Sequence, residues 1–272
     1  MSLRRRQGLV QLARKYDALI ISDDVYDFLQ WPLNEPVKGE WPSSMRIPRL
    51  CDIDLALGQS ENDHRGFGNT VSNGSFSKIS GPGVRTGWAE ATPAFAAGLA
   101  HTASTRSGGA PSQLCAAMVA ELVCNGELEK FIEEKTRPAM QRRHRLITDA
   151  VHKYLGPLGV TTRPSSQKDG DLYGGYFIWL DIGKEFPAKL VADVVKSEED
   201  VVVGYGNMFA VHGDEESARF DHSIRLCFAW EAEADLVDGV RRVGKVMARM
   251  QANEAHYTEL GKTLQTDMSK HV

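Results

Sequence analysis

The chain has 272 residues, of which 42% are hydrophobic and 25% charged, and its net charge of −4 gives a sequence pI of about 6.1. This length and composition predict a globular protein with one large domain or two modest ones. The weakly acidic balance argues against nucleic acid or an anionic membrane surface as the main partner, and no apolar run approaches the roughly 18 residues of a membrane span.

The first part of the chain predicts a helix, a strand and a long loop. Residues 3–16 carry apolar side chains at helical spacing, and the isoleucine-rich run at 18–22 predicts a strand that is buried on both faces. The segment 31–69 is rich in Pro, Gly, Asp and Asn, which favours a loop with short elements at most. We interpret Asp27 and Asp63 as solvated.

Two short strands and several helices are predicted next. Residues 70–78 and 84–91 alternate in polarity on either side of the turn "SGPG". Pro93 and Pro111 each stand at a predicted helix start, and Gly126 is placed to end the second helix. The segment 127–159 has helical spacing across an internal Pro138, which predicts a bent helix that connects two domains.

The C-terminal part predicts an α+β module with a core of its own. Its expected elements are strands at 160–164, 174–182, 201–209 and 223–230 and helices at 188–198 and 231–256. Trp88, Tyr176, Trp179 and Phe209 are interpreted as core residues. We therefore predict a large domain over 1–137, a small domain over 138–258 and a tail over 259–272.

Lys78 is the residue that most strongly indicates chemistry. It lies in "NGSFSKISGPGVRTGW", where strand and tight turn replace the solvated helix face on which a lysine usually lies. A lysine amine attacks a carbonyl when burial or nearby cations lower its pKa. The same stretch offers groups that suit a phosphate, namely the backbone amides of Gly81 and Gly83, the hydroxyls of Ser75 and Ser77, and the guanidinium of Arg85.

A second motif, "ISDDVYDFL", supplies Asp23 at the end of the predicted strand and Tyr26 three residues later. Lys78 and its phosphate-binding neighbours imply a lysine-bound aldehyde that carries a phosphate, which is pyridoxal 5′-phosphate (PLP). PLP withdraws electrons well when its ring nitrogen stays protonated beside a carboxylate, a role that Asp23 can fill. Tyr26 can donate a hydrogen bond to the 3′ oxygen, whereas Asp24 is out of phase and should point away.

In this order, "SDDVY", "SFSKISGPGVRTGW", "GGYFIWL" and "SIRLCF" resemble the class I/II aminotransferases of PLP fold type I, in the branch with kynurenine and 2-aminoadipate aminotransferases. The resemblance implies an α/β fold with a large PLP-binding domain and a small α+β domain. It implies that Lys78 holds the cofactor and moves the proton, that Asp23 and Tyr26 contact the ring, and that Ser75, Ser77 and Arg85 contact the phosphate.

The resemblance further implies a substrate role for Arg225 in "SIRLCF", which matches the arginine that binds the α-carboxylate. The expected reaction transfers an amino group between an L-amino acid, aromatic or 2-aminoadipate-like, and a 2-oxo acid. The expected assembly is a homodimer. The strand and turn around "GYGNMF" would lie near the substrate entrance.

Met1 aligns with the middle of the family's large domain, so we expect a chain that is truncated at its N-terminus and lacks part of the cofactor site and of the dimer interface. Two alternatives to transamination therefore stay open. One is a non-catalytic remnant that serves as an interaction domain, and the other is a PLP-dependent lyase, because the same electron sink serves both reactions.

No metal site is expected, because the eight histidines show no ligand spacing. The four cysteines, Cys51, Cys115, Cys124 and Cys227, show no CxxC spacing, which favours free thiols in a reducing, cytoplasmic setting.

Overall fold

The computed structural model describes residues 1–33, 47–106, 112–162, 172–214 and 219–269, and these form two compact units. The first unit contains the described residues of 1–141 and 172–175, and the second contains those of 142–162 and 176–269. The division falls inside one helix, a few residues beyond the predicted boundary at 137. The assignment of these units to a large and a small domain stays a prediction.

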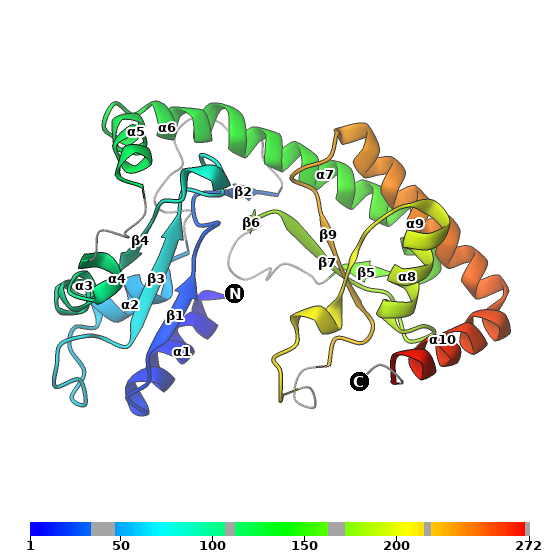
Figure 1. Cartoon of the computed structure of the whole chain (residues 1–272), viewed down its shortest axis with the longest axis horizontal. Helices are drawn as coiled ribbons and strands as arrows, with labels where there is room; N and C mark the ends of the chain where they lie inside the picture. The colour runs from blue at the N-terminus through cyan, green and yellow to red at the C-terminus, as the bar shows by residue number, and fades with distance from the viewer. Residues whose placement is uncertain (34–46, 107–111, 163–171, 215–218, 270–272) are drawn as a thin grey trace. The chain divides into compact units, whose positions relative to one another are not determined.

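The elements of the first unit follow the predicted order. They are α1 (Leu3–Lys15), β1 (Ile20–Asp23), β2 (Gln30–Pro32), α2 (Leu50–Ala56), β3 (Thr70–Ser75), β4 (Gly87–Glu90), α3 (Pro93–Ala100), α4 (Ala103–Arg106), α5 (Gln113–Cys124), α6 (Glu127–Phe131), the start of α7 (Arg137–Tyr154) and β6 (Leu172–Gly174). Figure 1 traces this order through the colours blue to green. Pro93 does open a helix, which Thr92 caps by accepting a hydrogen bond from the Phe95 amide, whereas Pro111 lies outside the described residues.

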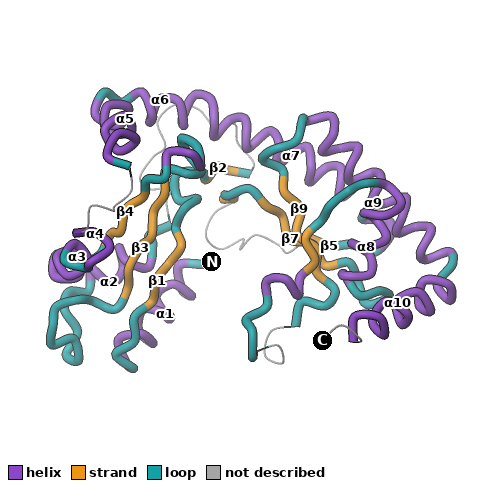
Figure 2. The backbone as a smooth tube through the Cα atoms, viewed as in Figure 1, coloured by secondary structure: helices purple, strands orange, loops and turns teal. Residues whose placement is uncertain are grey.

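The sheet of this unit has the strand order β1-β3-β4 (Figure 2). β1 and β3 run parallel with Ile20 opposite Thr70 and Asp23 opposite Asn73, and β4 pairs antiparallel with β3. A parallel pair needs a crossover connection, and this one contains α2. The strands therefore bring together side chains that are 50 residues apart in the sequence.

The prediction that 18–22 is a strand buried on both faces is wrong. β1 forms, but Ile21 is 68% exposed. Among the described strands β1 pairs only with β3, and among the described residues little apolar surface covers the face on which Ile21 lies. An isoleucine-rich run thus predicts the strand correctly and its burial incorrectly.

A buried ion pair joins α1 and α2 to the start of β3. The Arg14 Nε lies 2.7 Å from Asp54 Oδ1, and the other Asp54 oxygen accepts hydrogen bonds from the Asn69 amide at 2.6 Å and from Thr70 Oγ1 at 3.3 Å. Asp54 is 4% exposed, and a carboxylate that is buried to this degree needs such partners to remain charged. The pair therefore fixes where the parallel strand begins.

The helix predicted over 127–159 is interrupted near its proline, as predicted. α6 ends at Phe131, a π-helical segment covers Ile132–Thr136, and α7 continues from Arg137. The proline at 138 has no N–H to donate, which explains why the regular hydrogen-bond ladder is interrupted just before it. Gly126, in the left-handed conformation with φ 76°, separates α5 from α6 as predicted.

The second unit is the predicted α+β module. Beyond α7 it contains β5 (Thr161–Thr162), β7 (Phe177–Asp181), α8 (Ala188–Glu199), β8 (Gly204–Tyr205), β9 (Ser223–Cys227), α9 (Glu233–Ala252) and α10 (Glu254–Ser269). Its sheet has the order β5-β7-β9-β8, and all its pairs are antiparallel. Ile178, Leu180, Ile224 and Leu226 are buried on one face of this sheet, and with buried residues of α8 and α9 they form the core.

Three details of this module differ from the prediction. The segment at 201–209 is a strand only over β8, and Gly206–Phe209 form a 3-10 turn. The segment at 174–182 is not one strand, because β6 pairs with β2 in the first unit and β7 begins after a break at Gly175, whose φ is 85°. The predicted tail is helical as far as Ser269, in α10. Tyr257 anchors the start of this helix, since its ring is 5% exposed and its hydroxyl lies 3.3 Å from Glu198 Oε1.

No helix of the described residues combines the length and the apolar character needed to cross a membrane.

Close packing at Gly74 can be tested by substitution. A Cβ at this position would lie 2.1 Å from Trp88 Cε2, so Gly74→Ala should destabilise the protein by about 1–3 kcal/mol through overpacking. The readout is the urea midpoint of unfolding. The matched control is Gly8→Ala in α1, where nothing lies within 4 Å and the substitution should stabilise the helix by about 0.5–1 kcal/mol. Equal effects of the two variants would contradict this packing.

His144 predicts a pH dependence of stability. It is 7% exposed in α7, and burial lowers its pKa from 6.5 to about 4. The unfolded chain therefore takes up a proton below pH 6.5 while the folded chain resists it, so this contribution to stability is complete above 6.5 and is lost as pH falls toward 4. Between pH about 7.5 and about 5 the loss from this residue should be about 2 kcal/mol.

The measurement is the free energy of unfolding at both pH values, for the wild type and for His144→Phe, which keeps a ring against Phe228. The variant should lose less stability on acidification. If both proteins lose the same amount, His144 is not the responsible group.

Candidate active site

The first part of the site lies at the carboxyl edge of the parallel strands. Asp23 ends β1 and Ser75 ends β3, and the carboxyl ends of parallel strands form the usual binding edge of an α/β sheet. Asp23 is exposed, and its carboxylate accepts a hydrogen bond of 3.0 Å from the side-chain amide of Asn73, its register partner. Asp24 turns the other way, as predicted, and accepts from Ser22 and Ser72.

Tyr26 and Lys78 lie together at this edge. Tyr26 stands in the turn after β1, where the Asp27 amide donates to the Asp24 carbonyl and the Leu29 amide donates to the Tyr26 carbonyl. The Lys78 Nζ lies over the Tyr26 ring, 5.8 Å from its centroid, a cation–π contact that brings the amine and the phenol into one place. Gly175 lies against this ring, since a Cβ at that position would be in ordinary van der Waals contact with it, at 3.5 Å.

The loop between β3 and β4 carries the predicted phosphate ligands. Its two arms join where the Phe76 amide donates to the Thr86 carbonyl at 3.1 Å, and the Ser75 hydroxyl accepts from the Ser77 amide at 3.0 Å. Arg85 follows the 3-10 turn Pro82–Val84 in the left-handed conformation, with φ 49°. Its Nη1 donates to the Pro82 carbonyl at 2.8 Å, which leaves the guanidinium exposed and with its charge not neutralised by an acid among the described residues.

Arg225 belongs to the second unit, on the central strand β9 of its sheet. Its guanidinium carbon lies 4.0 Å from the centroid of the Phe177 ring and 3.9 Å from that of Phe209. Within the described part of the chain, no carboxylate forms an ion pair with it. The structure thus groups six of the predicted residues, Asp23, Tyr26, Ser75, Ser77, Lys78 and Arg85, in the first unit and holds Arg225 in the second.

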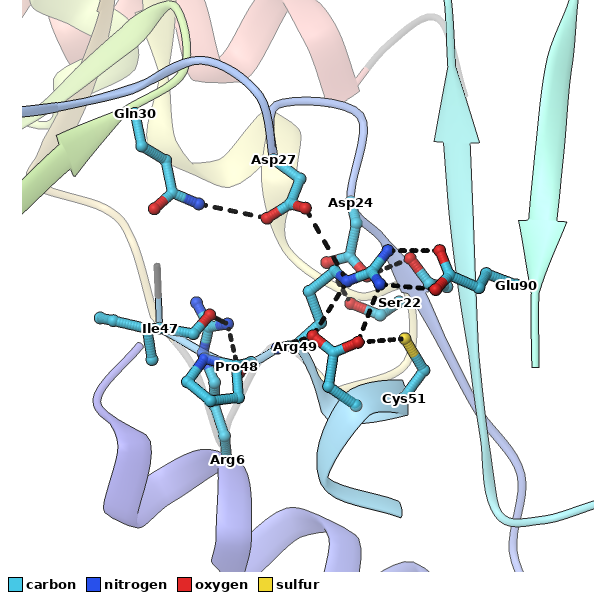
Figure 3. Close-up of polar contacts among 12 residues, drawn as sticks. Arg6, Ser22, Asp24, Asp27, Gln30, Ile47, Pro48, Arg49, Cys51 and Glu90 are labelled. Atoms are coloured by element: carbon cyan, nitrogen blue, oxygen red, sulfur yellow. Dashed lines mark hydrogen bonds and ion pairs between the residues drawn. The ribbon is translucent and has the colours of Figure 1, made fainter. Parts of the chain in front are cut away.

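Arg49 connects several of the elements that carry this site, and it was not predicted from the sequence. Figure 3 shows its guanidinium against three acidic side chains. Two nitrogens lie 2.7 Å from the two oxygens of Glu90 on β4, Asp52 on α2 accepts at 2.8 and 3.1 Å, and Asp27 lies 3.8 Å away in the turn that carries Tyr26. Hydrogen bonding to Glu90 is the main cause that raises the pKa of Arg49 above its usual value.

The interpretation of Asp27 and Asp63 as solvated is therefore wrong. The Asp27 side chain is 7% exposed, because Arg49 and the Gln30 amide both reach it (Figure 3). Asp63 is 7% exposed and accepts from the amides of Phe67 and Gly68. These backbone donors hold the pKa of the Asp63 carboxyl below its usual value against the opposing effect of desolvation. A loop rich in polar residues can bury acids when its own amides, or an arginine, receive them.

One group of possible metal ligands overlaps the Arg49 cluster. Cys51 Sγ and the carboxylates of Asp52 and Glu90 lie within 4.8 Å of one another. Both carboxylates already receive Arg49, and burial raises the pKa of the Cys51 thiol to about 11, which disfavours the thiolate that a metal requires. The arrangement is better explained as an ion-pair network.

A cavity of about 420 Å³ adjoins the Lys78 loop in the first unit. It is lined mainly by apolar side chains, among them Phe28, Phe76 and Trp88, whose rings also contact one another, and Arg137 reaches it as well. The described residues that line it include neither Lys78 nor Tyr26. We therefore do not count this cavity as part of the candidate site.

The sequence matches the aminotransferase class I and II family over residues 2–243, and the chain belongs to this family. It is 35% identical over 246 residues to an uncharacterized protein of Saccharomyces cerevisiae, with 90% of this chain and 52% of that protein covered. It is 24% identical to the 2-aminoadipate transaminase of Thermus thermophilus, with 91% of this chain and 53% of that enzyme covered. The family match confirms the resemblance to class I/II aminotransferases that the sequence motifs indicated.

Among solved structures, the aromatic aminotransferase Aro9 from Candida albicans, determined with ligands, superposes with a TM-score of 0.74 at 21% identity, covering 93% of this chain and 53% of that one. This likeness confirms the predicted fold class, PLP fold type I. The chain spans about half the length of the curated relatives that it matches.

Removing Arg49 should destabilise the first unit. Arg49→Met leaves Asp27, Asp52 and Glu90 close together without a cation. Asp27 is 7% exposed but Asp52 and Glu90 are 37% and 44% exposed, so the cost should lie below that of a fully buried pair, at about 2 kcal/mol. Chemical denaturation measures the loss. The control is Arg241→Met, which removes an exposed i,i+3 pair with Asp238 and should leave the unfolding midpoint unchanged. An Arg49→Met protein as stable as the wild type would show that the cluster contributes no net stability.

Proposed function

We propose that this chain provides the cofactor-binding lysine and the carboxylate-binding arginine of a PLP-dependent aminotransferase. The reaction would transfer an amino group between an L-amino acid and a 2-oxo acid. The observation that carries the proposal is the contact of the Lys78 amine with the Tyr26 ring, at 5.8 Å, at the carboxyl edge of a sheet in a chain that belongs to the aminotransferase class I and II family.

The residues present fit PLP by their chemistry. An exposed carboxylate at Asp23 suits a protonated ring nitrogen, and it is oriented by the Asn73 amide. The Tyr26 phenol suits a hydrogen bond to the ring oxygen. Arg85 keeps an unneutralised guanidinium in a loop whose backbone is closed by its own hydrogen bonds, and Ser75 and Ser77 add hydroxyl groups beside it.

When bound, PLP would supply the electron sink that makes a Cα proton of an amino acid acidic. In this proposal Lys78 would hold the cofactor and would carry a proton at its Nζ. Asp23 keeps the ring cationic, Tyr26 holds a proton at its phenolic oxygen, and the loop from Ser75 to Arg85 orients the phosphate. Arg225 would receive the α-carboxylate through its N–H groups.

The substrate class follows from the named relatives only. One relative is called 2-aminoadipate transaminase, and another, from Thermococcus litoralis, is called aromatic-amino-acid aminotransferase. We propose an aromatic or 2-aminoadipate-like amino acid as the substrate and a homodimer as the assembly. A reducing, cytoplasmic setting, which the four free cysteines favour, stays a prediction.

A non-catalytic interaction domain stays open as an alternative to the transaminase. One measurement distinguishes a transaminase from an interaction domain. A transaminase half that retains its chemistry converts bound PLP to pyridoxamine phosphate when an amino acid is added, whereas an interaction domain does not. A lyase would turn over the amino acid without accumulating that product.

Reduction with borohydride tests the cofactor proposal directly. PLP added to the protein should form an imine with Lys78, and reduction should fix the phosphopyridoxyl group on the peptide that contains this lysine, as seen by mass spectrometry. Lys78→Ala should lose this labelling. Arg85→Ala should weaken PLP binding about tenfold or more, because one charge-assisted contact to phosphate is lost.

The matched control is Lys15→Ala. Lys15 also lies over a tyrosine ring, 5.1 Å from the centroid of Tyr16, but this tyrosine is 66% exposed and far from any predicted ligand in the sequence. The variant should be labelled at Lys78 as the wild type is. Labelling spread over surface lysines, with no preference for Lys78, would refute the proposal.

A further inference from the structure

Arg225 is held in a different way from three other arginines of the second unit. Arg142, Arg241 and Arg249 each form an ion pair with a glutamate or aspartate. Arg225 contacts two aromatic rings, and within the described part of the chain no acid is paired with it. A cation–π contact holds a guanidinium in place without neutralising its charge. Arg225 therefore keeps its full charge for an anion from outside.

One ring comes from β7 and the other from the 3-10 turn that follows β8, and these two strands lie on either side of β9. Trp179 lies directly opposite Arg225 on β7, so Phe177, two residues earlier, extends from the same face and is a diagonal neighbour. On the other side Gly204 of β8 lies opposite Arg225, and Phe209 is the last residue of the 3-10 turn that follows β8. The guanidinium carbon is 4.0 Å from one ring centroid and 3.9 Å from the other.

Phe209 is itself held in place by packing. Its ring meets the Trp179 ring edge-on, with centroids 5.7 Å apart. Gly204 leaves room for it, because a Cβ at that position would lie 3.3 Å from Phe209 Cζ. A ring that is supported in this way can restrict its neighbour, whereas a freely rotating ring would not.

From these contacts we propose that Phe177 and Phe209 form an aromatic clamp, which sets the direction of the Arg225 guanidinium so that it receives a carboxylate along an N–H edge. Both are positioning residues, since they act through Arg225. The inference rests on the carboxylate role of Arg225 in the proposed function.

The aromatic clamp can orient the Arg225 guanidinium without neutralising its charge, which an acidic partner could not do. Two ring faces occupy the approaches to the guanidinium plane, so an anion is directed to the N–H groups at its rim, where the planar fork can bind two oxygens at once. Fixing the fork in advance also lowers the conformational entropy that binding has to overcome. The expected result is tighter and more strictly oriented binding of a carboxylate.

The first test needs no substitution. Protons above an aromatic ring resonate upfield, so the Hε of Arg225 in the wild-type chain should be shifted upfield relative to an exposed arginine such as Arg142. Phe177→Leu and Phe209→Leu should each move this resonance back downfield. Phe209→Trp should restore the upfield shift.

The second test measures carboxylate binding by titration with 3-phenylpropionate. Each leucine variant should bind this probe about tenfold more weakly, the effect of one lost cation–π contact together with lost orientation. The matched control is Phe220→Leu, which removes a ring 5.5 Å from Trp179 but neither of the two rings that contact the Arg225 guanidinium. This control should change neither the resonance nor the affinity. Arg225→Gln gives the affinity for the probe when no guanidinium is present at this position.

The outcomes separate this inference from the proposed function. If Arg225→Gln abolishes binding but neither leucine variant weakens it, the clamp is overturned while the role of Arg225 stands. If Arg225→Gln binds as well as the wild type, or if the wild type does not bind at all, the carboxylate role fails and the clamp fails with it. Weaker binding by both leucine variants, with rescue by Phe209→Trp, supports the clamp.

Discussion

The parallel pairing of β1 with β3 is the constraint on which the candidate site depends. It places Asp23 beside Asn73, and it brings the ends of the two strands to one edge of the sheet. The turn with Tyr26 and the loop with Lys78 both begin at this edge, which is why an amine and a phenol that are far apart in sequence are in contact. A shift of the register by one residue would turn every side chain of β1 to the other face and separate these groups.

Two groups of ion-paired side chains stabilise the pairing of β1 with β3. Arg14 and Asp54 fix the start of β3, and Arg49 connects α2, the Tyr26 turn and β4 through three acids. Buried ion pairs of this kind contribute little net stability compared with well-packed apolar residues, but losing one partner is expensive. Their role here is to specify one arrangement of loops and strands, because an acid without its arginine would be left buried.

The sequence allowed the helices and strands to be predicted better than their surroundings. Local patterns identified β1, the Lys78 loop, the bent helix and the α+β module, because each depends on spacing or on one proline or glycine. The burial of β1 was overestimated, since exposure depends on what covers a strand and not on its own residues. Likewise, β6 joins the first unit through pairing with β2, which no feature of "GGYFIWL" indicates.

Arg49 and Phe209 were missed for a related reason. An arginine in a polar loop looks solvated, and only the fold brings Glu90 to it from 41 residues away. Arg49 does carry one local signal, an aspartate three residues later that accepts from its own amide in the manner of a capping box. Phe209 was interpreted as core, and its position beside Arg225 depends on the order of β7, β9 and β8.

The arginines of this chain show how a fold can separate structural charges from charges kept for a ligand. Arg14 and Arg49 are paired with acids, so an anion from outside would have to compete with a partner that is already in place. Arg85 is held by a backbone carbonyl and Arg225 by two aromatic rings, and neither kind of contact cancels a positive charge. Neutral partners fix the direction of a guanidinium at little cost to its field, and such an arginine is electrostatically prepared for phosphate or carboxylate. On this argument, the type of partner an arginine has, and not its burial alone, distinguishes a binding residue from a structural one.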